Sequence, residues 1–578
     1  MEGTSNDFGR ASSDLLESYD VAILGGGLAG LTLGIQLKKA RPDTTIIVAE
    51  RRSGPAPEAA FKVGESTVEI SAHYFANVVG MKDHMDQHQG RKCGLRYFFS
   101  REGNQDITQR LEWGFSDHSN FPTYQLDRGR FENELWKRAV EAGVHVFDGC
   151  RVDEVDLSKG GHTLRLIRED GTETVSARWV VDATGRASLL KRKLGLAKEV
   201  EHKINSSWFR LAGGLDIEDF SDDPAWLGRM AKRGLREAST NHLTGEGYWL
   251  WLIPLASGPI SIGIVADPRI HPFDEINTLD GALDWINRHE AQVGEALQGR
   301  RDQIEDFLKV EHFSFSSERV YSPDRWCLTG EAGVFADPLY SPGSDFIAMG
   351  NTFIADVVAR DLDGEDVAGR VEIFNAQLLL MFNNILRLYT DHYPAFGSAQ
   401  VMNAKLIWDF CVYWAHIAPR FVKGKLADLE FTQGIVEYLQ ASGRLGASVQ
   451  PLFQAWNELG GRELGPGFVA TNPLPGVWDL LVELGQPMDD AVLQAKYAEN
   501  LEFLQALSVL VFHAAARALD DDRIDEDTPI NYFALSLDPS KWEDEDGMLN
   551  GDGISLAQAR ERAPGLEHVM SGEVVKTP

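Results

Sequence analysis

Regularly spaced glycines near the N-terminus could hold a nucleotide. Gly25, Gly27 and Gly30 fit the pattern G-x-G-x-x-G, which here follows an apolar, strand-like run and opens a helix-like segment. The first glycine permits a tight turn, the second lets the backbone approach a pyrophosphate, and the third lets the helix pack on the strand. A tight turn without a ligand is the alternative, but the flanking patterns favour a dinucleotide site.

The residues around this turn complete the predicted site. The helix would begin with Leu28 and Ala29, where free backbone N–H groups stabilise phosphate charge. Glu50 ends the next strand-like run, 20 positions after Gly30, and would accept a hydrogen bond from a ribose hydroxyl, with Arg51 beside it. The turn alone does not distinguish NAD from FAD.

Two later segments favour FAD. Residues 180–186 (VVDATGR) contain Asp182 and Gly185, and residues 326–338 (WCLTGEAGVFADP) contain Asp337. Both segments resemble the later flavin-contacting segments of the hydroxylase-type FAD fold, which implies that Asp337 lies near the ribityl chain at a helix N-terminus. The sequence has no second G-x-G-x-x-G unit for NAD(P)H. The flavin therefore arrives already reduced, or NAD(P)H binds without this pattern.

Two further motifs narrow the resemblance. Residues 249–254 read W-x-W-x-I-P, with Trp249 and Trp251 on one side of a strand, and residues 335–343 read F-x-x-P-x-x-S-x-G. Either motif alone could reflect core packing. Together, and in this order behind the glycine turn, they resemble the two signature motifs of the flavin-dependent halogenases. The resemblance covers residues 19–360.

The halogenase family also has a catalytic lysine in a K-x-G context after its flavin strap. Lys92 matches this context, and Gly64, Glu65 and Ser66 resemble the strap. Lys62 is the rival, but it directly precedes the strap. Lys92 could also be an ordinary surface lysine. The resemblance favours Lys92 as the catalytic residue.

The resemblance implies a specific chemistry. FADH2, delivered by diffusion from a separate flavin reductase, and O2 would oxidise chloride or bromide to hypohalous acid. Lys92 would direct this oxidant to an electron-rich carbon, with Ser341 helping to position it, because an ammonium is a compact donor of three hydrogen bonds. A tryptophan pair would keep the substrate from the flavin. The residues expected along the halide site and tunnel are Trp249, Trp251, Pro338, Pro342, Gly343 and Ser344.

Four positions depart from the family pattern. Indole-specific members have a glutamate before the motif serine, where this chain has Tyr340, so we expect a phenol- or pyrrole-like substrate rather than free tryptophan. Pro342 has no N–H and removes one potential halide donor, although the next two residues could still hold an anion. Asp345 nearby would disfavour an anion. Glu331 stands where related folds often have aspartate.

Other candidate residues have less specific interpretations. Arg128 resembles a family arginine that precedes a helix and could contact the flavin. We expect His73, His118 and His242 to be structural. The aromatic residues Trp408, Phe410, Tyr413, Trp414, Tyr389 and Tyr393 are expected to form a helix-packing core, with a substrate pocket as the alternative.

The apolar patterns predict the elements that position these residues. Strands are expected at residues 19–24, 44–49, 145–147, 163–167 and 179–181, with a strand pair over 248–265 and a helix over 28–40. Helical spacing follows at 374–388, 401–418 and 491–519. The prediction is a mixed α/β fold, with a Rossmann-type start, an FAD-binding domain of the hydroxylase and glutathione-reductase type, a mixed substrate sheet and a helical C-terminal region.

The expected organisation has four parts. They are a flexible leader (1–18), an FAD-binding core with an interleaved substrate sheet (19–360), a helical domain (361–530) and an acidic tail (531–578). The leader is too polar to be a signal peptide, and no run is long and apolar enough to span a membrane.

Composition excludes several classes of protein. The 578 residues are 43% hydrophobic, as in globular domains, and carry a formal charge of −31, which disfavours nucleic acid and anionic membranes as partners. The four cysteines lie far apart, without metal-ligand spacing, as expected for buried thiols in a reducing cytoplasm. No metal is expected, and a homodimer is an open option.

Two alternatives to halogenation stay open. One is a flavin-dependent monooxygenase or oxidoreductase on a halogenase-like scaffold, which Pro342 motivates. The other is a carrier-protein-binding or scaffold role without catalysis, which the intact motifs disfavour.

Overall fold

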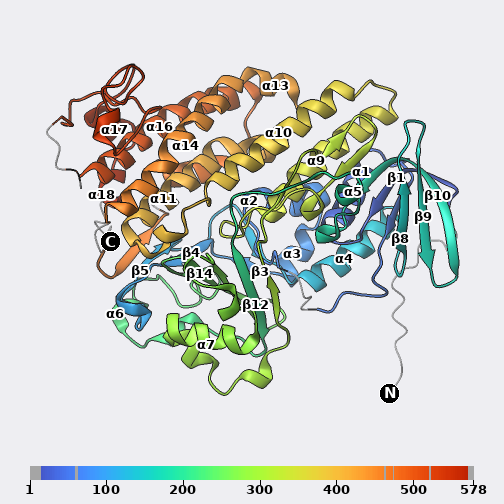
Figure 1. The fold of residues 1–578 in the computed structure, drawn as a ribbon, viewed down its shortest axis with the longest axis horizontal. Coiled ribbons are helices and arrows are strands. Elements are labelled where there is room, and N and C mark those ends of the chain that lie inside the picture. Colours follow the sequence, from blue (N-terminus) through green and yellow to red (C-terminus); the bar gives the residue numbers. More distant parts are fainter. Residues whose placement is uncertain are drawn as a thin grey trace.

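Two sheets and a layer of long helices make up the fold (Figure 1). The computed structural model describes residues 15–58, 63–460, 464–472, 474–517, 519 and 523–570. Most of the expected leader, Lys62 and the last eight residues of the expected tail lie outside these ranges. The mixed α/β fold that the sequence predicts is confirmed.

The first sheet begins with the predicted strand–helix–strand unit. β1 (Ser18–Leu24) pairs in parallel with β2 (Ile46–Ala49) and β10 (Gly171–Asp182), and α1 (Leu28–Ala40) connects β1 to β2. Parallel strands β7 (His145–Phe147) and β19 (Trp326–Leu328) extend the sheet on its two sides. The strands β8 (Arg151–Asp156) and β9 (His162–Arg168) pair antiparallel beside β10. The carboxyl ends of β1, β2 and β10 therefore meet at one edge, where α/β sheets bind ligands.

The second sheet is mostly antiparallel and contains the predicted strand pair. This pair is β14 (Tyr248–Pro254) and β15 (Ile260–Ala266), flanked by β12 (Asn205–Leu211) and β13 (Thr240–Gly245). Leu250 and Leu252 on β14 face a core shared with α7 (Leu279–His289), so the alternate residues of β14 face the opposite side. That opposite side carries the two motif tryptophans.

A strand from the helical region completes this second sheet. β20 (Gly467–Ala470) pairs in parallel with β5 (Leu111–Gly114), which pairs in turn with β4 (Leu95–Phe98). β4 then pairs in parallel with β13. The C-terminal third therefore contributes directly to the sheet that the N-terminal part begins.

Long helices form the layer that Figure 1 shows in yellow to red. The predicted segments correspond to α10 (Ala368–Arg387), α11 (Ala399–Val412) with α12 (Ala418–Val422), and α16 (Asp490–Ala516). The sequence missed α14 (Val436–Glu458), because Gly443, Gly446 and Pro451 interrupt its helical pattern. One hydrophobic core runs from Tyr19 to Met570.

Two expected boundaries fall inside packed structure. Residue 360 lies within α9 (Gly343–Leu362), which packs against α1. The described part of the expected tail, residues 531–570, contains α17 (Leu556–Arg562) and α18 (Leu566–Met570) and buries Trp542 in the common core.

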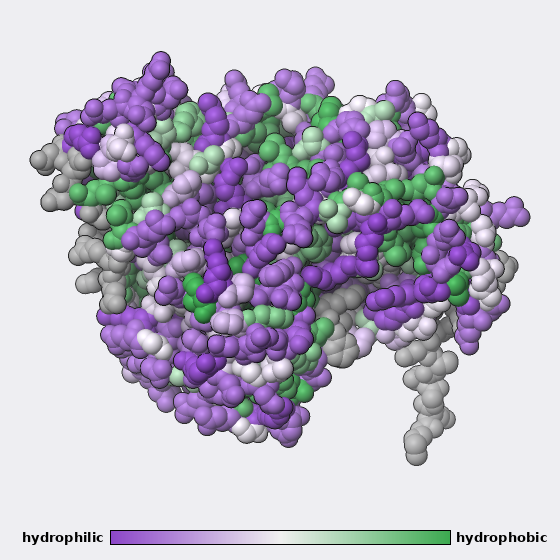
Figure 2. Space-filling model, viewed as in Figure 1, coloured by the Kyte–Doolittle hydropathy of each residue, from purple (hydrophilic) through white to green (hydrophobic). Residues whose placement is uncertain are grey.

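Hydrophilic residues cover most of the face shown in Figure 2, with hydrophobic residues scattered between them. Among the described residues, no helix has the length and apolar character required to cross a membrane.

Candidate active site

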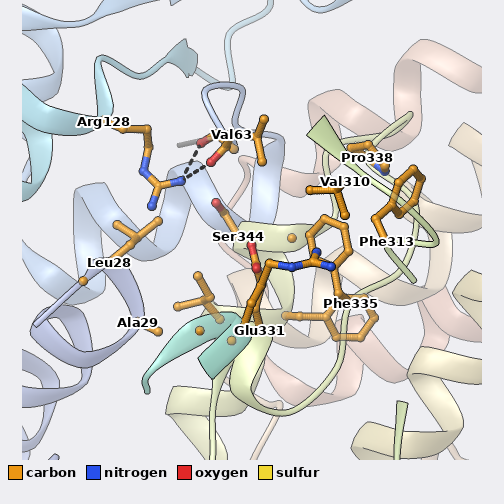
Figure 3. Close-up of a pocket in the computed structure, with 18 of the residues that line it drawn as sticks. Leu28, Ala29, Val63, Arg128, Val310, Phe313, Glu331, Phe335, Pro338 and Ser344 are labelled. Atoms are coloured by element: carbon orange, nitrogen blue, oxygen red, sulfur yellow. Dashed lines mark hydrogen bonds between the residues drawn. The ribbon is translucent and has the colours of Figure 1, made fainter. Parts of the chain in front are cut away.

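A cavity of about 690 Å³ is lined by both sheets and by the start of α9 (Figure 3). The predicted cofactor residues that line it are Gly25, Gly27, Leu28, Ala29, Glu50, Arg51, Gly64, Glu65, Ser66, Arg128, Gly185 and Asp337. The predicted halide and tunnel residues Trp249, Trp251, Pro338, Pro342, Gly343 and Ser344 line it as well, together with Ser341. Gly30, Asp182 and Lys92 do not line it.

The glycine turn requires glycine for steric reasons. Gly25 has φ +108°, and a Cβ there would lie 2.6 Å from the carbonyl oxygen of Ala183. A Cβ on Gly30 would lie 2.0 Å from the carbonyl oxygen of Gly25. Gly30 therefore lets the start of α1 pack closely against the turn and β1, although it does not line the cavity.

The cavity fits a dinucleotide such as FAD. α1 begins at the cavity without a side-chain cap and without an acidic residue in its first turn. Its first N–H groups can therefore stabilise a pyrophosphate. Glu50, also at the cavity, accepts hydrogen bonds from the N–H of Gly26 (2.7 Å) and of Arg52 (2.8 Å), which orients its carboxylate beside the turn.

Arg128 holds the backbone at the start of the strap. It begins α4 (Arg128–Glu141), and its guanidinium donates to the carbonyl oxygen of Val63 at 2.5 Å (Figure 3). It also donates to Glu132 at 2.7 Å. Glu65 of the strap is buried and accepts from Arg210 at 2.6 Å. Although Arg210 acts in the opposite direction, burial raises the pKa of Glu65.

The two predicted aspartates are bound to protein groups. Asp182 accepts from the N–H groups of Thr184 (3.0 Å) and Leu190 (2.7 Å), so it stabilises the turn after β10 rather than lining the cavity. Asp337 lines the cavity but accepts from the hydroxyl of Tyr393 at 2.6 Å and pairs with His202 at 2.8 Å. Glu331, noted in the sequence only as a departure, also lines the cavity.

An aromatic wall closes one side of the cavity. Trp249 and Trp251 project from one face of β14, with their rings 5.7 Å apart. The Trp249 indole N–H donates to Tyr393 at 3.0 Å, which links the wall to Asp337. Trp251 lies across Gly263, where a Cβ would come within 2.1 Å of the indole. The wall is therefore held by both packing and hydrogen bonds.

His242 belongs to this wall, although the sequence indicated only a structural role. Its ring stacks on Tyr97 at 4.5 Å and lies 5.2 Å from that of Trp249, and the residue lines the cavity. Burial lowers its pKa to about 3, so the imidazole is neutral. No motif in the sequence distinguishes it from other histidines.

Lys92 lies directly behind the cavity lining. It ends β3 (Gly90–Lys92) and is 3% exposed, so the interpretation as a surface lysine is wrong. Its ammonium Nζ donates to Ser66 Oγ at 2.8 Å and to the carbonyl oxygen of Thr67 at 2.7 Å. Ser66 Oγ lies 3.0 Å from Thr240 Oγ1, and both hydroxyl residues line the cavity. Burial lowers the pKa of Lys92 to about 7, although two neighbouring carboxylates act in the opposite direction.

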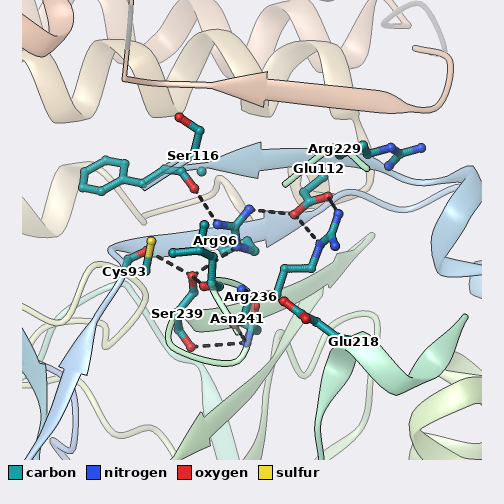
Figure 4. A network of polar contacts seen from close by, with 12 residues as sticks. Cys93, Arg96, Glu112, Ser116, Glu218, Arg229, Arg236, Ser239 and Asn241 are labelled. Carbon is teal, nitrogen blue, oxygen red and sulfur yellow. Dashed lines mark hydrogen bonds and ion pairs between the residues drawn. The ribbon is translucent and has the colours of Figure 1, made fainter. Parts of the chain in front are cut away.

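A buried charge network holds the backbone beyond Lys92 (Figure 4). Ser239 Oγ donates to the carbonyl oxygen of Cys93 at 3.0 Å and accepts from Arg96 Nε at 3.1 Å. Arg96 and Arg236 both bind Glu112, at 2.6 and 2.9 Å. All three charged side chains are at most 1% exposed. The sequence missed this network because isolated charged residues are normally interpreted as surface positions.

The S-x-G turn combines an unusual backbone with an uncapped helix. Ser341 has φ +57°, and Pro342 precedes α9 without a side-chain cap. Asp345 does not line the cavity, contrary to the expected repulsion of an anion there. Its carboxylate accepts from the N–H of Ser71 (2.9 Å) and the hydroxyl of Tyr413 (2.7 Å), and burial raises its pKa to about 7.

Comparisons with known proteins agree with this geometry. A family profile described as "FAD binding domain" matches residues 18–258. The chain is 26% identical over 447 residues to the flavin-dependent halogenase chlA of Dictyostelium discoideum, covering 71% of this chain and 72% of the relative. It is 27% identical over 358 residues to a 1H-pyrrole-2-carbonyl-[peptidyl-carrier protein] brominase of Pseudoalteromonas luteoviolacea. This match covers 61% of this chain and 79% of the relative. The chain is an enzyme related to the flavin-dependent halogenases.

Solved structures show the same fold over a longer stretch. The crystal structure of halogenase PltM in complex with ethyl mercury and mercury matches this chain with a TM-score of 0.62. The match is 17% identical and covers 83% of this chain and 99% of that one. The shared fold therefore includes part of the C-terminal helical region.

The sequence analysis missed one buried polar cluster of this protein. The hydroxyl of Tyr340 donates to Asp409 at 2.8 Å, and Asp409 pairs with buried Lys405 at 2.9 Å. Gln450 donates to Asp409 at 2.8 Å. The aromatic residues predicted as a helix core surround this cluster, with the rings of Phe410 and Tyr389 within 6 Å of Tyr340.

Proposed function

We propose that the protein is an FAD-dependent halogenase that uses O2 and halide to make hypohalous acid, relayed through Lys92 to an electron-rich aromatic small molecule of secondary metabolism. One observation carries the proposal. The glycine turn, the tryptophan pair and the S-x-G turn line a single cavity, and Lys92 lies one hydrogen bond behind it, through Ser66.

Residues of this chain supply binding and separation. The N–H groups at the start of α1 would hold the pyrophosphate, and Glu50 would accept from a ribose hydroxyl. When bound and reduced, FAD would supply electrons to O2, which would take the rest of its electrons from the halide and so oxidise it. Trp249 and Trp251 exclude the aromatic substrate from the flavin side. Lys92 receives the oxidised halogen and orients it.

Tyr340 supports a phenol- or pyrrole-like substrate. It occupies the position of the glutamate of indole-specific members, and its hydroxyl donates to Asp409, so it brings no charge to stabilise an indole cation. A phenol or pyrrole stabilises the cationic intermediate through its own hydroxyl or nitrogen. The pyrrole substrate in the name of the P. luteoviolacea relative agrees with this assignment.

A reaction with a panel of substrates tests the proposal. The protein is incubated with a flavin reductase, NADH, FAD, O2 and bromide, and with phenols, pyrroles and indoles in turn. We expect products in which bromine replaces hydrogen, formed only when bromide is present. Products that carry oxygen instead, independent of halide, would contradict halogenation.

The flavin would come from a separate reductase, and the cell compartment would be the cytoplasm. All four cysteines are free and buried, as expected where thiols stay reduced.

The reductase proposal has its own test. NAD(P)H alone should not reduce FAD bound to this protein, whereas addition of any flavin reductase should start turnover. A homodimer is a further proposal, which light scattering of the purified protein tests.

Pro342 favours a second candidate, a flavin-dependent monooxygenase. It precedes the first turn of α9 at the cavity and has no N–H to offer a halide. If this candidate is correct, substrate should stimulate NAD(P)H consumption by the flavoprotein itself, and halide should not affect the product.

A further inference from the structure

A short segment links Lys92 to a buried carboxylate on α9. The carbonyl oxygen of Thr67 accepts from Lys92, and four residues later the N–H of Ser71 donates to Asp345. The hydroxyl of Tyr413 also donates to Asp345. The segment of residues 67–71, directly after the strap, therefore binds the lysine at one end and the aspartate at the other.

A second buried acid lies between these two contacts. Glu69 begins α2 (Glu69–His73) and is 5% exposed, while Lys92 is 3% and Asp345 is 2% exposed. The charge of Lys92 interacts with the carboxylates of both Glu69 and Asp345. One buried lysine thus lies near two buried acids around the same short segment, residues 67–71.

The other titratable groups around Lys92 stay neutral. His242 on β13 faces the lysine, and burial keeps its pKa far below neutrality. Burial likewise raises the pKa of Tyr413 far above its ordinary value. Lys92, Glu69 and Asp345 are therefore the groups of this cluster that can carry charge near neutral pH.

We propose that Asp345 and Glu69 are positioning residues whose charges set the protonation state of Lys92 and thereby decide whether it meets the oxidised halogen as an amine or as an ammonium. The proposal rests on the proposed halogenase function. Transfer of a proton from the Lys92 ammonium to a carboxylate leaves an amine. The amine takes the halogen from hypohalous acid and releases water, forming an N–halogen bond. The halogen then passes to the aromatic carbon, and the ring proton returns to the nitrogen, which restores the amine.

The direction of each pKa shift agrees with this exchange. Burial lowers the pKa of Lys92 to about 7 and raises that of Asp345 to about 7. Burial also raises the pKa of Glu69. Lys92 and Asp345 therefore bind a proton with similar affinity near neutral pH, the condition under which a change of protonation requires little free energy.

Labelling of Lys92 with acetic anhydride tests the proposal without any turnover. Only the amine form reacts, so the extent of acetylation against pH, measured by mass spectrometry of the Lys92 peptide, reports its protonation. Asp345→Asn and Glu69→Gln each remove a negative charge. Each should move the midpoint of labelling to lower pH by about half a unit, which is about threefold more amine at a given pH. Asp345→Glu should restore the midpoint.

Lys82 supplies the control in the same digest. It is an exposed lysine that pairs with Asp86 rather than Asp345. Its labelling midpoint should stay unchanged in Asp345→Asn and Glu69→Gln. If the Lys92 midpoint stays unchanged in both variants, or if the Lys82 midpoint shifts equally in them, the proposal is wrong. Because labelling needs no flavin, halide or substrate, a shift without halogenation would instead contradict the proposed function.

Discussion

Lys92 Nζ and Ser66 Oγ lie 2.8 Å apart, yet only Ser66 lines the cavity. The lysine is therefore within reach of a small oxidant formed there but shielded from a bulky substrate by the strap. In the proposed function, an oxidant formed in the cavity would meet Ser66 first and would reach Lys92 only past this hydroxyl.

Loss of Lys92 should separate flavin oxidation from halogenation. Lys92→Met keeps much of the buried volume but removes the amine, so we expect product formation to fall about 100-fold or more, the range of a directly participating group. Oxidation of FADH2 by O2 should continue at the normal rate. Product is measured by mass spectrometry and oxidation by flavin absorbance. Lys82→Ala, on the surface, is the control, and retained halogenation in Lys92→Met would contradict the assignment.

Substitution of Gly25 should abolish binding of FAD. In Gly25→Ala the new methyl group would lie 2.6 Å from the carbonyl oxygen of Ala183, in a backbone conformation with φ +108° that alanine rarely adopts. Binding is measured by fluorescence quenching of added FAD. Gly446→Ala in α14, where a Cβ meets no atom within 4 Å, should bind FAD normally and be more stable by up to about 1 kcal/mol.

Trp251 should limit leakage of oxidant. Trp251→Phe shortens the wall above Gly263 and removes the hydrogen bond to Ser261. We expect more hydrogen peroxide and less halogenated product for each FADH2 oxidised, because water and substrate reach the flavin side. An unchanged ratio of product to peroxide would show that this indole does not seal the cavity.

Glu112 should contribute stability that depends on pH. Burial raises its pKa, but Arg96 and Arg236 outweigh burial and hold the pKa below its ordinary value of 4.5. Its contribution is therefore present above pH 4.5 and is lost as the pH falls through the lower value of the folded state. Glu112→Gln should cost about 3–5 kcal/mol at pH 7, because it leaves two buried guanidinium groups without a counter-charge.

Urea unfolding at pH 7 and at pH 4 checks this prediction. The difference in unfolding free energy between the wild type and Glu112→Gln should narrow at the lower pH. Glu199→Gln, in an exposed pair with Lys203, should change stability by less than about 1 kcal/mol at both pH values.

Local patterns predicted the nucleotide-binding start of the fold. The helix expected at residues 28–40 matches α1, and the strand expected at 145–147 matches β7, because both are short, contiguous and strongly apolar. The cavity-lining residues of the glycine turn, the strap and the two signature motifs were also predictable, since these are contiguous motifs, whereas His242 was not. Lys92 followed from its K-x-G context, but its burial did not.

Contacts between distant segments were not predictable. The pairing of β4 with β13, and of β5 with β20, joins segments more than 140 residues apart. Asp345 meets Ser71 only because α9 packs against α2. A single sequence holds no signal for such pairings, so the acids near Lys92 and the charge network around Glu112 emerge only from the folded chain.

The parallel pairing of β20 with β5 makes a strand of the helical region part of the second sheet. A chain shortened after residue 362 would leave β5 as a bare edge strand, open to association with other chains. An exchange of helical regions between relatives, made to alter substrate choice, would have to transplant β20 in the same register. Changes in substrate choice on this scaffold would therefore have to keep the pairing of β5 with β20.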